Sequence, residues 1–113
     1  MIDIYADLDE LKINTYQQGS VPSDMPDSYI TIWNDTSIDN LNSDNKTNII
    51  EYQFTVIYYT KEWSNIYSIF ENIVSLLKSK NYIVSGMGFD IDSGVDEYMA
   101  RCIEVQKLER RIS

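Results

Sequence analysis

The sequence predicts an α+β fold, a two-layer sandwich in which an N-terminal helix and one long helix cover a mostly antiparallel sheet of four to five strands. Two observations predict it. The stretch Thr60–Asn81 has apolar residues at spacings of three and four, the period of a helix. The segments on either side are rich in β-branched and aromatic residues, which is typical of strands. Because these strands follow one another in the chain, antiparallel pairing is favoured, in the order α-β-β-β-α-β-β.

The long helix is expected to build the core. Its apolar stripe consists of Ile66, Ile69, Phe70, Ile73, Val74, Leu76 and Leu77. Thr60 can cap its start, and Lys78 and Lys80 suit its last turn, where the helix dipole favours cations. Since the opposite face is polar, the stripe needs a flat apolar surface to cover, which a sheet supplies.

Three elements are expected before residue 35. A short helix is predicted at residues 2–11, because Ile4, Leu8 and Leu11 would share one helical face. A short strand at 13–16 is followed by the stretch Val21–Ser28, which holds both prolines and is predicted to be a connection. The next strand, 29–34, places Trp33 on one side with Tyr29 and Thr31.

The longest polar stretch, Asp35–Asn48, is composed mainly of Asp, Asn, Ser and Thr, which favour turns. It is therefore predicted to be a long loop. Loops of more than roughly 12 residues in small domains are usually functional or disordered. Its charged side chains are the candidate contacts with a protein partner: Asp35, Asp39, Asp44 and Lys46.

The strongest strand is predicted at Ile49–Tyr59, where apolar and polar residues alternate. Near its end Ile57 and Tyr59 make the second face apolar too, which indicates a sheet covered on both sides there. After the long helix a strand begins at 82–85, is interrupted by two glycines and continues at 89–92. The last strand is expected at 98–108, and the tail 109–113 is expected to be frayed.

Charge restricts the classes of function. The net charge of the 113-residue chain is −9, and residues 1–60 carry ten acids against two bases. An acidic half argues against nucleic-acid binding through phosphates, which needs a basic surface. No apolar run is long enough to span a membrane, and no signal peptide is recognisable. With one cysteine, Cys102, no internal disulfide can form, which favours folding in a reducing, intracellular compartment.

Catalysis and metal binding find little support. The chain has no histidine, the usual general base and metal ligand near neutral pH. The run 90–97 resembles a calcium loop, but Val95 stands where glycine is required and Arg101 where glutamate is required. Cys102 is interpreted as a structural thiol. These features lower the expectation of an enzyme, and they predict no cofactor and no metal site.

Aromatic residues are more informative. Nine tyrosines and two tryptophans are a surplus for one small core, and such side chains are common at protein interfaces. They either brace a small sheet or form a subunit interface. The candidates for the interface are Trp33, Tyr59, Trp63 and Tyr67.

Three stretches of the sequence form a recognisable succession: PSDMPDSYITIW (22–33), the polar segment containing DNKTN (44–48), and IIEYQFTVIYYTK (49–61). Together they resemble the tail completion proteins of long-tailed bacteriophages, also called tail terminators or head-to-tail joining proteins. The segment GMGFDIDSGVDEYMARCIEV (86–105) is similar to the closing hairpin of these proteins. The family often has basic or histidine residues after the tyrosine of that hairpin, whereas this chain has Met99-Ala100-Arg101.

The resemblance implies a virion protein that is not an enzyme. It would be assembled in the host cytoplasm and form a hexameric ring on the end of the tail tube at the head–tail junction. Its partners would be copies of itself, the tail tube protein and the head connector protein, and the segment Asp35–Asn48 is the candidate contact with the tube or the connector. DNA would pass through the lumen without specific binding, and no membrane would be involved. An acidic lumen would keep DNA from adhering to the ring.

Other readings stay open at this point. One is another neck or connector protein of the phage particle. A second is an acidic inhibitor that binds the basic surface of a partner, for which a dense carboxylate face is expected. A third is a small-molecule-binding enzyme, which requires a pocket with convergent polar groups.

Overall fold

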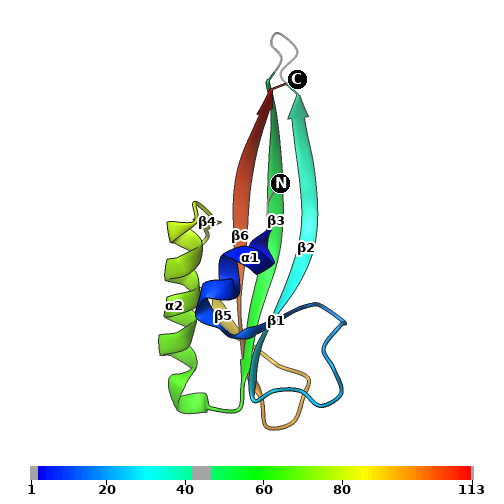
Figure 1. Ribbon diagram of the computed structural model, residues 1–113. Coiled ribbons are helices and arrows are strands. Elements are labelled where there is room, and N and C mark those ends of the chain that lie inside the picture. Colours follow the sequence, from blue (N-terminus) through cyan, green and yellow to red (C-terminus); the bar gives the residue numbers. More distant parts are fainter. Residues whose placement is uncertain (1–2, 42–46, 113) are drawn as a thin grey trace.

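The computed structural model describes residues 3–41 and 47–112 and confirms the α+β fold. A six-stranded sheet carries two helices on one face (Figure 1). The helices are α1 (Ile4–Leu8) and α2 (Ile66–Ser79). The strands are β1 (Asn14–Gln17), β2 (Ser28–Leu41), β3 (Thr47–Thr60), β4 (Ile83–Val84), β5 (Phe89–Ile91) and β6 (Met99–Ile112). One 3-10 turn follows α1 at Asp9–Leu11 and another precedes α2 at Trp63–Asn65.

The strand order is β1-β2-β3-β6-β4, and β5 pairs with β6. The sheet has one strand more than the four to five that the sequence predicts, because the interrupted strand after α2 forms the two separate strands β4 and β5. All pairs are antiparallel except β1 with β2, which is parallel. The parallel pair arises because residues 18–27 carry the chain back to the start of β1 before β2 begins.

Helix α2 begins later than the sequence predicts. Thr60 does not cap it, because Thr60 is the buried last residue of β3 and its hydroxyl accepts a hydrogen bond from the Glu62 N–H. The helix ends in a Schellman motif, in which left-handed Asn81 (φ 71°) lets the Tyr82 N–H reach the Leu77 carbonyl. Four residues at helical spacing are buried against the sheet: Ile66, Phe70, Ile73 and Leu77.

The main core lies between the helices and the sheet. It joins the apolar face of α2 with Ile4 and Leu8 of α1 and with alternating residues of the three long strands, among them Val56 and Ile103. A second, smaller core lies on the opposite face of the sheet, as the apolar end of β3 predicts. It contains Tyr29, Ile57, Tyr59, Tyr98, Ala100 and Cys102. Side chains from the proline-containing segment 18–27 and from residues 92–98 pack against it.

The prediction of a loop at Asp35–Asn48 is wrong for most of its length. Strand β2 continues to Leu41 and β3 starts at Thr47, and the two strands pair from Ser28↔Thr60 to Leu41↔Asn48. The prediction of a frayed tail is also wrong, since β6 pairs with β3 as far as Ile112. The polar residues at the ends of β2 and β6 have a poor propensity for strands. Backbone hydrogen bonds to β3 offset this, so strand pairing overrides the local preference of the sequence.

Candidate assembly surfaces

The candidate assembly surface with the clearest geometry is an extension of the sheet, here called the arm. It consists of residues 34–41 of β2, 47–53 of β3 and 107–112 of β6. Figure 1 shows these three strands running past the ends of both helices, so no helix covers the arm. The molecule is accordingly elongated, 54 × 26 × 24 Å. A register shift between Asn34 and Thr36 marks a bulge where β2 enters the arm.

Both sides of the arm are open strand edges. β1 pairs with β2 only as far as Ile32, and β4 pairs with β6 only at Val105 and Gln106. Among the described residues, no other strand pairs with the arm segments of β2 or β6. An open edge presents a row of unpaired backbone N–H and C=O groups, to which another strand can pair. The arm therefore offers two different edges for β-sheet extension.

The base of the arm is fixed to helix α1 by a partly buried cluster. The Tyr82 hydroxyl donates a hydrogen bond of 2.7 Å to Asp7 Oδ2, and Lys107 Nζ lies 3.8 Å from the same oxygen. Lys107 Nζ also lies 4.6 Å from the centroid of the Tyr82 ring. Burial, the hydrogen bond and the negative charge of Asp7 raise the pKa of Tyr82 well above its ordinary value. Tyr82 therefore stays neutral and keeps donating at physiological pH.

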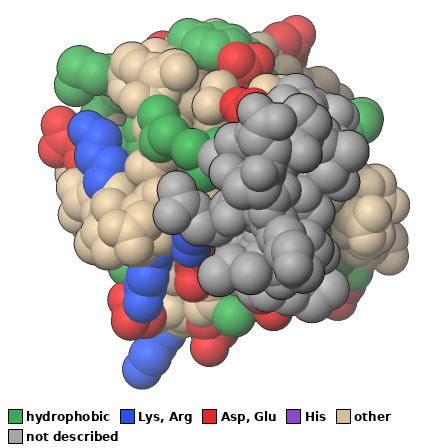
Figure 2. Space-filling view, turned by 90° about the horizontal axis from the view of Figure 1, so that it is seen from above, with side chains coloured by type: hydrophobic (Ala, Val, Ile, Leu, Met, Phe, Trp, Pro, Cys, Tyr) green, Lys and Arg blue, Asp and Glu red, His purple; other side chains and the backbone are tan. Residues whose placement is uncertain are grey.

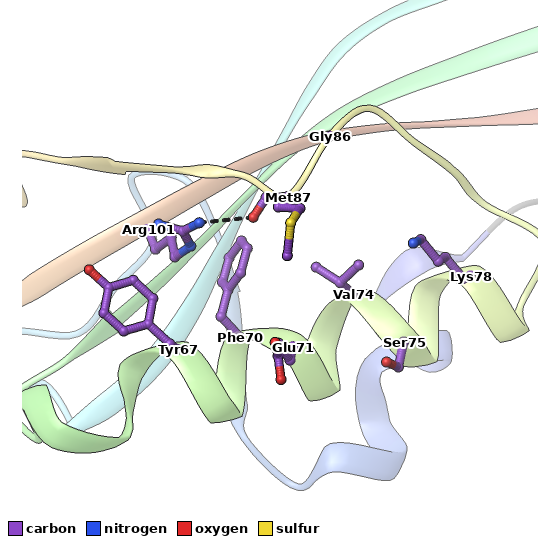
Figure 3. Close-up of a pocket in the computed structure, with 9 residues that line it drawn as sticks. All are labelled: Tyr67, Phe70, Glu71, Val74, Ser75, Lys78, Gly86, Met87 and Arg101. Carbon is purple, nitrogen blue, oxygen red and sulfur yellow. Dashed lines mark hydrogen bonds between the residues drawn. The ribbon is translucent and has the colours of Figure 1, made fainter.

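A second candidate surface is a pocket between α2 and the turn that joins β4 to β5, with a volume of about 280 Å³ (Figure 3). Arg101 of β6 lies over the rings of Tyr67 and Phe70 at 5.1 and 5.3 Å. Its guanidinium donates hydrogen bonds to Asp90 Oδ1 at 2.9 Å and to the Met87 carbonyl at 3.0 Å. Arg101 therefore holds the pocket wall together instead of offering free donors to a ligand.

Asp90 connects this wall to the helix. It accepts a 3.0 Å hydrogen bond from the Tyr67 hydroxyl in addition to the one from Arg101. The hydrogen bonds from Arg101 and then Tyr67 lower the pKa of Asp90, and the hydrogen bond to Asp90 raises the pKa of Tyr67. These directions describe an ionised aspartate held between two donors. They do not create a general acid or base near neutral pH.

Three of the four predicted interface aromatics are exposed. Trp33, Trp63 and Tyr67 are 50%, 59% and 53% exposed. They lie on different elements, Trp33 on β2 at the base of the arm and the other two at the start of the helical segment. Tyr59 is only 7% exposed and stacks on Tyr29 at 4.7 Å in the second core. Tyr59 therefore braces the fold and leaves almost no surface for a neighbouring subunit.

Of the predicted partner contacts, Asp35 and Asp39 lie on the arm strand β2. Asp44 and Lys46 lie outside the described residues.

Sequence reasoning missed several exposed apolar residues, among them Met87 and Phe89, which are 73% and 54% exposed. These two lie in and beside the Gly86–Gly88 turn. The two glycines that surround Met87 were the available signal, because both have positive φ and turn the chain sharply outward.

Charged side chains do not form one dense carboxylate face on the described surface. Lys61 lies between Asp27 and Glu97, at 3.8 and 3.7 Å, and Lys80 pairs with Glu10 at 3.2 Å. Figure 2, viewed along the arm, shows Lys and Arg side chains close to Asp and Glu side chains on the same side of the molecule. This mixture gives no specific support to the acidic inhibitor.

Comparisons with known proteins give no family assignment. No known family model matches the chain, and no curated protein is significantly similar to it. Among the side chains that the structure describes, no group of three or more Asp, Glu, Cys or His is placed to hold a metal ion. None of the described helices has the length and apolarity needed to cross a bilayer.

Proposed function

We propose that this protein is a structural component of a bacteriophage or prophage particle at the head–tail junction. In this proposal copies of the chain form a ring, hexameric in the family that the sequence resembles, that caps the tail tube and joins it to the head connector. The protein acts by assembly and not by catalysis, and it needs no cofactor. Its place in the cell is the virion, after assembly in the host cytoplasm.

The arm is the observation that supports this function best. It is a long sheet extension free of helices, with one open edge on β2 and a different open edge on β6. A ring needs a heterologous interface, in which one surface of a subunit binds a different surface of the next. Two unlike open edges on opposite sides of one arm meet this requirement.

Exposed aromatics give secondary support. Trp33 lies on β2 just before the arm, and the Trp63 ring is exposed although its Nε1–H donates to the Glu97 carbonyl at 3.2 Å. Large aromatic side chains at such positions often anchor protein contacts. They are available for the tube or connector, as well as for a neighbouring subunit.

The test combines reconstitution with genetics. Purified protein, alone and mixed with the tail tube protein of the same phage, is examined by electron microscopy and by binding measurements. We expect rings and capped tubes of limited length. A phage with a stop codon in this gene should make full heads and tails that stay unjoined. Absence of both rings and tube binding, or a normal phage yield, would overturn the proposal.

Tube length separates the proposed role from that of another neck protein. A tail terminator stops tube growth, so tubes should lengthen when the protein is omitted. A neck protein that binds only the connector would leave tube length unchanged.

A further inference from the structure

We propose that neighbouring copies join through their arms, with the β6 segment 107–112 of one copy pairing beside the β2 segment 34–41 of the next. This inference rests on the proposed ring and names the surface that would build it. The occupant of each open edge is thus a second copy of the chain.

Strand direction determines the kind of pairing. β2 and β6 are each antiparallel to β3, so they run parallel to one another on opposite sides of the arm. If copies are related by rotation about an axis along the arm, β6 of one copy runs parallel to β2 of the next. The contact is then heterologous, and each copy keeps one free edge until the ring closes. Closure pairs every edge and removes the open backbone groups that promote uncontrolled aggregation.

Charge distinguishes this pairing from its alternatives. The segment 34–41 contains the two acids Asp35 and Asp39 and no base. The segment 107–112 contains the bases Arg110 and Arg111 and the single acid Glu109, in addition to Lys107, which is paired with Asp7. Pairing β2 with β2 would bring acidic strands together, and pairing β6 with β6 would bring basic strands together. Opposite charges on adjacent strands stabilise a sheet and like charges destabilise it, so β6 beside β2 is favoured.

The remaining strands determine where the contact stops. β1 lies outside β2, and β4 and β5 lie outside β6, but only at the helical end of the sheet. These strands stand between two neighbouring copies at that end, whereas nothing in the described chain stands between their arms. Paired copies must therefore meet at the arms and diverge toward the helices. Such a wedge shape suits a closed ring with the arms gathered on one side.

Charge exchange between the two edges tests the pairing. One variant reverses the β2 edge (Asp35→Lys with Asp39→Lys), and a second reverses the β6 edge (Arg110→Glu with Arg111→Glu). A third carries all four substitutions and so exchanges the two signs. Matched controls make the same changes of net charge at exposed positions away from the arm: Glu62→Lys with Glu71→Lys, and Lys12→Glu with Lys78→Glu. Circular dichroism and thermal unfolding verify that each variant folds.

Association is measured by sedimentation velocity at low salt, where surface charges are least screened. We expect each single-edge reversal to weaken association by roughly tenfold or more. The four-substitution variant should return to within about threefold of the natural protein, because the opposite signs again face each other. The control variants should change the association constant by less than about threefold.

Failure of this inference differs from failure of the proposed function. If rings form and neither reversal weakens them more than its control does, the edge pairing is wrong and the ring stands. If the four-substitution variant is as weak as the single-edge reversals, the pairing is likewise wrong. If the natural protein forms no ring, even with tail tube protein present, the proposed ring and the edge pairing both fail. If the largest assembly is a closed dimer, the edge pairing is also wrong, because a heterologous contact does not stop at two copies.

Discussion

The hydroxyl of Tyr82 donates a 2.7 Å hydrogen bond to the carboxylate of Asp7, which joins the segment after α2 to helix α1. Lys107 of the arm strand β6 lies 3.8 Å from the same carboxylate. Three distant parts of the chain therefore meet at one partly buried carboxylate. Short helices such as α1 are unstable alone, so this contact helps to keep α1 on the sheet.

Replacing Tyr82 by phenylalanine should lower the free energy of unfolding by about 1–2 kcal/mol, because Asp7 then lacks a partly buried donor. Chemical denaturation at neutral pH measures the change. Tyr5→Phe is the matched control, since Tyr5 is exposed, and it should change stability by less than about 0.5 kcal/mol. Equal effects of the two variants would contradict the importance of this hydrogen bond.

Stability should fall at alkaline pH because two tyrosines are held neutral. Burial raises the pKa of Tyr29 to about 12, and burial with the Asp7 contact raises that of Tyr82. In the unfolded chain tyrosine ionises near pH 10. The stabilisation is therefore complete below about pH 10 and is lost as pH rises through the folded-state values. Chemical denaturation should give a lower free energy of unfolding at about pH 11 than at about pH 8. The difference should be smaller for Tyr82→Phe than for the natural protein. A flat profile would contradict it.

Gly88→Ala should destabilise the protein more than Gly86→Ala. Both glycines have positive φ, so each substitution carries a backbone cost of about 1–2 kcal/mol. A Cβ at Gly88 would also lie 2.7 Å from the Cys102 carbonyl oxygen and 2.7 Å from the Phe70 ring. A Cβ at Gly86 would have no atom within 4 Å. Overpacking adds about 1–3 kcal/mol. Thermal unfolding of the two variants tests the difference, and equal melting temperatures would contradict the close approach.

Asp90→Asn should lower the pKa of Tyr67. The hydrogen bond to the Asp90 carboxylate and its negative charge both raise that pKa, and the amide removes the charge. The ionisation of Tyr67 can be followed by NMR of a ring-labelled tyrosine. Asp92→Asn is the control and should leave the titration of Tyr67 unchanged. An unaltered Tyr67 titration in Asp90→Asn would show that the contact does not form in solution.

Leu77→Ala and Trp63→Ala should separate the core of the fold from its surface. Leu77 is fully buried between α2 and the sheet, so truncation should cost about 2–5 kcal/mol. Trp63 is exposed, and its loss should cost about 1 kcal/mol or less. If the proposed ring uses Trp63, the variant should stay folded yet assemble poorly, as sedimentation can show. A large loss of monomer stability in Trp63→Ala would contradict its assignment to the surface.

Periodicity predicts those parts of the fold in which apolar residues must be hidden from water. The stripe of α2 and the alternation of β3 identify residues that are buried in the core or packed against it, including the apolar end of β3 that faces the second core. Burial acts locally on each side chain, so its pattern is visible in the sequence.

Periodicity could not reveal the arm. Residues 35–41 have turn-forming composition and no single apolar face, and only pairing with β3 makes them a strand. For the same reason Tyr59 looked like an interface residue, because its stacking on Tyr29 comes from the pairing of β2 with β3. Of the four candidate partner contacts chosen from composition, Asp35 and Asp39 lie on the arm, whereas Asp44 and Lys46 lie outside the described residues.

By itself the sequence determined the fold class, the covering helix, the two apolar faces of the sheet and the acidic charge. Hydrophobic spacing and net charge are properties of neighbouring residues, so no coordinates are needed to find them. Only the tertiary structure decided that β6 lies beside β3, that β1 runs parallel to β2, and that three strands extend beyond the helices as an arm with two open edges. These features depend on backbone pairing between distant segments, which leaves little trace in local composition.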